Sequence, residues 1–168
     1  MRIKIDLPDT YKVGGAEPDQ YEYDTDSLLE RPKPNFIMTR DASGKVASCY
    51  RDNSWNYYAY SMGKGSTLHF VGNIPHKYID DAKWLMFILD RVVGIGKNNN
   101  NLSFKTLKGY FYAVIKPLCS YAEGEQISFF DLLCSKEHMT KLTQLNMVHS
   151  RFCLNFVAFI TMFGSIGE

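Results

Sequence analysis

The period of the hydrophobic pattern changes at Pro75, and this change most constrains the fold. Before Pro75, apolar residues form short strand-like runs between turn residues, such as the hairpin pattern of 35–40 and 46–51 around a loop with Gly44. After Pro75 they recur every three or four residues, which is the spacing of one helix face. We therefore predict a mainly α fold in which a helical bundle follows a small β-hairpin and strand-rich segment.

Helical spacing predicts four helices after Pro75, over about 76–93, 103–122, 128–145 (in one piece or two) and 146–163. Ser103 is a candidate N-cap of the second helix. Pro117 lies inside that helix and predicts a kink or break near 113–116, because proline lacks an amide donor. Residues 123–125 are expected to end it. The helix over 146–163 is apolar nearly all round, which predicts a central position or two packing partners.

Charge separates along the 168 residues, although the net charge is only +1. Residues 1–34 hold eight acidic and five basic residues with four of the six prolines. This composition predicts a poorly structured acidic arm with short extended pieces at most. Residues 97–151 hold seven basic and four acidic residues, and no acidic residue lies between Lys97 and Lys116. We therefore divide the chain into the arm (1–34), a strand-rich segment (35–74) and a helical domain (75–168) whose local positive field suits a polyanion.

The second predicted helix has two distinct faces. Its apolar face is formed by residues spaced for core packing, which are Leu107, Tyr110, Phe111, Val114, Leu118 and Tyr121. A narrow opposite sector holds Lys105, Lys108, Tyr112 and Lys116, with Gly109 between them. Lysine charge and a phenol hydroxyl both suit phosphate oxygens. The alternative interpretation is an ordinary solvated face of an amphipathic helix.

Motifs for several kinds of chemistry are missing from the sequence. It has no phosphate-binding G-x-x-x-x-G-K-[ST], no G-x-S-x-G and no H-E-x-x-H. The four cysteines form no C-x-x-C pair and the four histidines are far apart, so we predict no metal site, no cofactor and no catalytic residues. A catalytic set assembled by the fold stays open. The N-terminus has no apolar signal region and no run is long enough to span a bilayer, which predicts a cytoplasmic protein.

Several stretches resemble one family. Residues 102–121, where a Ser/Thr-rich start is followed by Tyr110 and an apolar ladder, are similar to the second helix of the core-binding domain of tyrosine recombinases, the phage-type integrases. Residues 126–133 resemble the third helix of that domain and residues 150–160 the fourth. Residues 41–55 look like the strand-rich N-terminal segment of larger integrases. The resemblance covers about residues 36–163.

The resemblance implies a four-helix SAM-like core-binding bundle that clamps double-stranded DNA through its backbone, with a catalytic domain on the other side of the duplex. Bound protomers would assemble on the DNA, and the location would be a prokaryotic cytoplasm and nucleoid. Combined with the charge pattern, it gives as DNA-binding candidates Lys97, Lys105, Thr106, Lys108, Tyr112, Lys116 and Arg151.

The chain departs from this family at the catalytic residues. The family's tyrosine nucleophile and its arginine–lysine–histidine–arginine set belong to a downstream domain, and the chain stops at Glu168 as if cut from a longer protein. The pair His149 and Arg151 is two residues apart, whereas the family uses H-x-x-R. We therefore expect a chain that binds DNA, lacks a catalytic site and needs the missing C-terminal catalytic domain as a partner.

A second hypothesis is a helical protein–protein interaction module that does not bind DNA. Its surface would be the aromatic cluster of Trp55, Tyr57, Tyr58 and Tyr60, or the helix over 146–163. Against it, the alternating aromatic residues of the cluster could simply pack the hairpin onto the bundle. A small-molecule enzyme is the third and weakest hypothesis, because no site for it can be found in the sequence.

Overall fold

The structure is a computed structural model, and it describes residues 2–5, 21–24, 31–61, 65–91 and 102–144. Helical segments hold more of these residues than strands do, which confirms the prediction of a mainly α chain with small strand pairs. In chain order the helices are α1 (Tyr58–Ser61), the 3₁₀-helix η3 (His76–Tyr78), α2 (Ile79–Arg91), α3 (Phe104–Tyr110), the π-helix η5 (Phe111–Ile115), α4 (Lys116–Glu125), α5 (Phe129–Cys134) and α6 (Lys136–Gln144).

The strands of the described residues pair two by two, always antiparallel. They are β1 (Arg2–Ile5) with β2 (Tyr21–Asp24), β3 (Ile37–Arg40) with β4 (Val46–Cys49), and β5 (Ser54–Asn56) with β6 (Thr67–His69). The β3–β4 pair confirms the predicted hairpin. The described parts of the acidic arm are the short strands β1 and β2, as expected for brief extended pieces, and residues 31–34, which lie in neither a helix nor a strand.

The β3–β4 hairpin is closed by the side chain of Asp41. Its Oδ1 accepts hydrogen bonds from the backbone N–H of Ser43 at 2.8 Å and of Lys45 at 3.0 Å. The same oxygen accepts from the Ser43 hydroxyl at 2.7 Å, and this hydrogen bond is the main reason that the pKa of the carboxyl group is lowered. Gly44 follows with φ +82°, a left-handed conformation that glycine adopts without steric cost.

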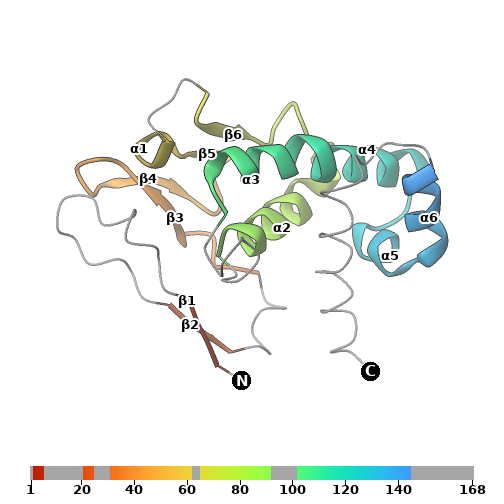
Figure 1. The fold of residues 1–168 in the computed structure, drawn as a ribbon, viewed down its shortest axis with the longest axis horizontal. Coiled ribbons are helices and arrows are strands. Elements are labelled where there is room, and N and C mark those ends of the chain that lie inside the picture. Colours follow the sequence, from red (N-terminus) through yellow and green to blue (C-terminus); the bar gives the residue numbers. More distant parts are fainter. Residues whose placement is uncertain (1, 6–20, 25–30, 62–64, 92–101, 145–168) are drawn as a thin grey trace.

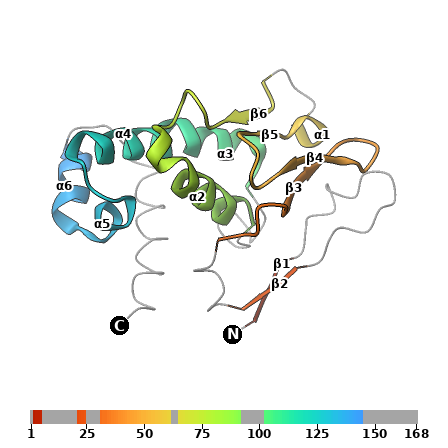
Figure 2. The same cartoon turned by 180° about the vertical axis from the view of Figure 1, so that it is seen from behind.

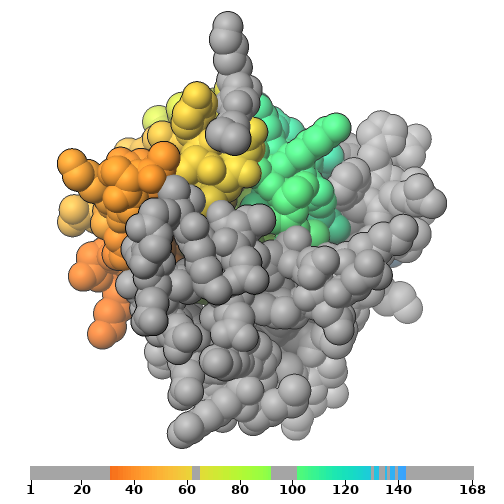
Figure 3. Space-filling model, turned by 60° about the vertical axis from the view of Figure 1, so that its left-hand side comes forward, coloured from red at the N-terminus to blue at the C-terminus, as the bar shows by residue number. Residues whose placement is uncertain are grey.

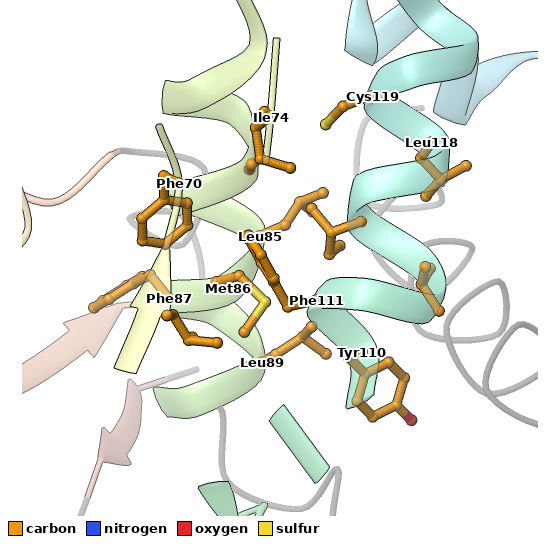
Figure 4. Close-up of a cluster of buried hydrophobic side chains, with 14 of the residues drawn as sticks. Phe70, Ile74, Leu85, Met86, Phe87, Leu89, Tyr110, Phe111, Leu118 and Cys119 are labelled. Carbon is orange, nitrogen blue, oxygen red and sulfur yellow. The ribbon is translucent and has the colours of Figure 1, made fainter. Parts of the chain in front are cut away.

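The elements lie along one axis, with β3 to β6 at one end and α5 and α6 at the other (Figures 1 and 2). Helices α2 and α3–α4 occupy the middle. A single hydrophobic core runs through both regions: it includes Met38 and Trp55 from the strands and Met86, Phe111 and Leu118 from the helices. Figure 4 shows side chains of α2 packed against those of η5 and α4. Residues on both sides of the predicted boundary at residue 75 therefore contribute to the same hydrophobic core.

Helix α2 is the central element of the described chain. The apolar residues that recur at helical spacing, such as Ile79, Leu85 and Leu89, are buried as expected, and burial extends further, around most of the helix. Three charged residues, Lys83, Asp90 and Arg91, are also buried. The strands cover the side of α2 that its own spacing leaves polar: Lys83 Nζ donates to the Arg51 carbonyl at 2.9 Å, and Arg91 Nη2 donates to the Met38 carbonyl.

Helices α3, η5 and α4 form one continuous helical run, as expected for 103–122. Ser103 is its N-cap and accepts from the Thr106 N–H at 3.2 Å. The predicted break near 113–116 is a π turn at Phe111–Ile115. Pro117 cannot donate to the carbonyl four residues earlier and its ring crowds that carbonyl, so the preceding turn widens.

The end of this run differs from the prediction. The helix continues through Gly124, and Gln126 ends it with φ 55° and ψ 32°. The Gln126 N–H bonds the carbonyls of Ala122 and Glu123, so a left-handed residue satisfies the last turn without glycine at that position.

The predicted helix over 128–145 is in two pieces, α5 and α6. Ser128 caps α5 by accepting from the Asp131 N–H at 3.0 Å. Ser135 interrupts the run because its φ of −90° and ψ of 111° are extended. The predicted helix over 146–163 lies outside the described residues.

Candidate nucleic-acid interface

The outer side of the α3–η5–α4 run carries Lys105, Lys108, Tyr112 and Lys116, which we call the basic face. Lys105 is exposed, Tyr112 is 40% exposed, and Lys108 and Lys116 are half-buried. The opposite side packs into the core through Leu107, Phe111 and Leu118. The two faces that the sequence predicts for this helix are therefore present.

Lys108 is held at the start of β6. Its Nζ donates to the Gly65 carbonyl at 2.9 Å. Gly65 has φ +80°, and a Cβ added there would lie 3.2 Å from the Lys108 ammonium. The positive φ therefore favours glycine at this position, and a Cβ there would require the Lys108 ammonium to shift by a few tenths of an ångström.

The side chain of Lys116 is bound by a residue that follows the end of β6. Its Nζ donates to the Asn73 side-chain oxygen at 3.1 Å and lies 5.9 Å from the centroid of the Tyr112 ring. The ring contact places Tyr112 and Lys116 on the same side of the run. Both lysines thus reach residues that flank β6, in a part of the chain more than 40 residues away.

The positive charges of the basic face have no acidic partner among the described residues. Residues 102–122 contain three lysines and no aspartate or glutamate. The ion pairs found in the described part of the chain join Arg31 to Asp81, Arg91 to Asp90 and Lys141 to Glu137. Lys108 and Lys116 use neutral acceptors, which hold their side chains without cancelling their charge. Figure 3 shows the green surface of α3 directly beside the yellow surface around α1.

The remaining DNA-binding candidates have different positions. Thr106 is half-buried beside the helix start, and its hydroxyl lies 2.9 Å from the Ser103 hydroxyl, so it belongs to the capping region. Lys97 and Arg151 lie outside the described residues. The structure therefore places Tyr112 beside Lys116 and holds Lys108 at the other end of β6, while Lys105 is exposed one helical turn before Lys108.

The aromatic cluster of the second hypothesis is mostly inside the protein. Trp55 is 0% exposed, Tyr57 is 1% exposed, and Tyr60 is partly buried, with its hydroxyl accepting from the Arg40 N–H at 2.7 Å. Tyr57 also stacks on Phe104 at 4.9 Å between ring centroids. Only Tyr58, at 61% exposure, offers an open surface within this cluster. These side chains pack the strands onto the helices.

Sequence reasoning missed the residues that hold the lysines, Gly65 and Asn73. Glycine next to Lys64 and the Gly72–Asn73 pair are turn signals, but turn signals do not say which distant helix they will meet. Sequence reasoning also missed the buried polar group of Asp90, whose Oδ2 accepts from the Tyr57 hydroxyl at 3.1 Å.

Two buried titratable groups have shifted pKa values, and both shifts come mainly from burial. The pKa of Lys83 is lowered because burial penalises its charged form. Burial raises the pKa of the Cys119 thiol to about 12, so at neutral pH it is not a reactive thiolate. Within the described residues, no three acidic, histidine or cysteine side chains gather as metal ligands, and no helix is long and apolar enough to cross a membrane.

Comparisons of the chain with models of protein families, with curated proteins and with solved structures gave no match.

Proposed function

We propose that this chain binds double-stranded DNA by contacting the phosphate backbone of the duplex. In this proposal it forms the N-terminal, DNA-binding part of a site-specific tyrosine recombinase. In this proposal the basic face contacts phosphates. Strand cleavage belongs to a separate catalytic domain, and several protomers bind one DNA site. The residues that carry the contact are Lys105, Lys108, Tyr112 and Lys116, with Thr106, Lys97 and Arg151 as further candidates.

The observation that carries the proposal is that Lys108 and Lys116 reach the two ends of β6 from one helical run, and that no lysine of the basic face has a carboxylate partner in the described chain. A phosphate backbone attracts such a stripe, and lysine binds phosphate as a point charge. Tyr112, 40% exposed beside Lys116, adds a hydroxyl that can donate to phosphate.

The order of the helices supports the assignment to the recombinase class. Helix α2, the α3–α4 run and the α5–α6 pair follow one another with short connections wherever the structure describes them. They correspond to the first three helices of a SAM-like core-binding bundle, and residues 146–163 would supply the fourth. This correspondence is part of the proposal.

Salt dependence of duplex binding tests the proposal. Fluorescence anisotropy with a labelled 30-base-pair duplex should give an affinity that falls about 40-fold between 50 and 200 mM salt, for roughly three phosphate contacts. Charge reversal by Lys105→Glu with Lys108→Glu should weaken binding at least about tenfold at 100 mM salt. Flat affinity across this range, or an unaffected double variant, would overturn the proposal.

A matched control uses Lys33→Glu with Lys45→Glu. Both lysines are exposed, and they precede and follow β3 in the strand-rich segment. The net charge changes by the same amount as in the first double variant. If both double variants lose affinity equally, overall charge explains binding and the basic face does not.

A further inference from the structure

The residues after β6 hold one lysine of the basic face in a defined orientation. We propose that Asn73 is a positioning residue for DNA binding, which makes the turn of the strand-rich segment a working part of the interface. This inference rests on the proposed function.

The turn that carries Asn73 is fixed to the core. Phe70, just before it, is 0% exposed and packs edge-on against Phe111 at 5.4 Å between ring centroids. The Asn73 N–H donates to the Phe70 carbonyl at 3.1 Å. Because Phe111 and Lys116 belong to the same helical run, this ring contact joins the turn to the element that carries the lysine.

The side chain of Asn73 is itself oriented. Its Nδ2 donates to the His69 carbonyl at 3.0 Å, which leaves Oδ1 as the acceptor for Lys116 at 3.1 Å. An amide is well suited to this task, since it accepts one N–H of the ammonium without cancelling its charge. The other two N–H groups of that ammonium remain for a phosphate.

The same arrangement occurs at the other end of β6, where the Gly65 carbonyl accepts from Lys108. Neutral oxygens at the two ends of β6 thus orient two lysines, one oxygen before the strand for Lys108 and one after it for Lys116. Fixing a long side chain before binding removes part of the entropy cost of ordering it in the complex. The strand-rich segment therefore does more than cover the core: it sets the positions of the charges that meet DNA.

The decisive variant is Asn73→Asp in the full chain, with the labelled 30-base-pair duplex as probe. A carboxylate at this position would pair with Lys116 and withdraw it from phosphate. We expect about eightfold weaker binding at 0.1 M salt and a slope of log affinity against log salt that is smaller in magnitude by about 0.9. Asn73→Ala keeps the charge of Lys116 and should lose about threefold in affinity with the slope unchanged.

Ala42→Asp is the matched control, because Ala42 is exposed in the loop that joins β3 to β4, and Figure 1 shows this hairpin and α4 in different parts of the molecule. It changes the net charge equally and should leave the slope unchanged. A structural role of Asn73 alone would lower the melting temperature without changing the slope. The melting temperature of every variant is therefore measured by circular dichroism.

A double-mutant cycle with Lys116→Met keeps the test valid if Asn73→Asp does not fold. With Lys116 replaced, Asn73→Ala should have no further effect on affinity. Additive effects, or a slope that Asn73→Asp does not change, would overturn the role of Asn73. If the Asn73 variants bind like the original chain while Lys105→Glu with Lys108→Glu does not, only the positioning role is lost. If the original chain binds no duplex, the proposed function falls as well.

Discussion

Lys83 and Lys116 make the same bond in two different regions of the molecule. Each ammonium donates to an oxygen of the strand-rich segment, Lys83 to the Arg51 carbonyl at 2.9 Å and Lys116 to the Asn73 amide at 3.1 Å. Lys83 is 3% exposed in the central helix α2, and the charges of Asp80 and Asp52 act on it. Lys116 is half-buried on the basic face, and no carboxylate of the described chain pairs with it.

The difference shows that a lysine's bond to a carbonyl does not reveal its role. Burial lowers the pKa of Lys83, because removing the charged ammonium from water is unfavourable. Its hydrogen bond to the Arg51 carbonyl links α2 to the residues just before β5. On the basic face the same bond only orients a charge that stays available to a ligand. Three predictions test this contrast between structural and available charges.

The largest change in stability is expected for Asp90→Ala, which alters one of the three buried charged residues of α2. Asp90 accepts from the Tyr57 hydroxyl at 3.1 Å, and its Oδ2 lies 3.3 Å from Arg91 Nε. Removing it leaves a buried guanidinium without its neighbouring carboxylate, so the free energy of unfolding should fall by about 3–5 kcal/mol. Urea denaturation followed by circular dichroism measures this. Glu137→Ala, in the exposed pair with Lys141, is the control and should leave stability unchanged. Equal losses would contradict the contrast.

Lys116→Met and Lys83→Met should separate the two lysines directly. Each substitution removes one positive charge and keeps a side chain of similar length. Lys116→Met should weaken duplex binding about eightfold at 0.1 M salt and reduce the salt slope by about 0.9 in magnitude. Lys83→Met should leave that slope unchanged, because its ammonium is inside the protein. The contrast is lost if both variants change the slope alike in anisotropy titrations.

The smallest effect is expected at the end of α4. Gln126 has φ 55°, a conformation that costs a residue with a Cβ about 1 kcal/mol more than glycine. Gln126→Gly should therefore raise the free energy of unfolding by about 1 kcal/mol and leave DNA affinity unchanged. Thermal melting and anisotropy measure the two quantities. A rise in DNA affinity would mean that the stability of α4 limits binding. The contrast between structural and available charges would then have to be revised.

Much of the fold could be predicted because its signals are local. The spacing of Leu85 and Leu89 predicts α2, Ser103 predicts the start of α3, and Pro117 predicts the disturbance before it. Turn residues around Gly44 likewise predict the β3–β4 hairpin. In each case the physical cause lies within a few residues of the effect.

What could not be predicted depends on contacts between distant parts of the chain. The burial of Lys83 and Asp90 arises because strands cover the polar side of α2, which the spacing of α2 does not encode. The acceptor for Lys116 lies 43 residues away at Asn73. The lysines of the candidate site could be named from the sequence, but the residues that orient them could not.

The π turn at Phe111–Ile115 also sets the helical phase of the basic face. In a regular α-helix, eight residues from Lys108 to Lys116 rotate the chain by about 800°, which would leave the two side chains about 80° apart. A π turn takes up roughly one extra residue, so the same stretch counts as about seven α-helical steps, or about 700°, close to two full turns. Both lysines can therefore reach the two ends of β6. Deleting one residue from this turn would rotate one half of the stripe by about 100° against the other, with every lysine still in the sequence.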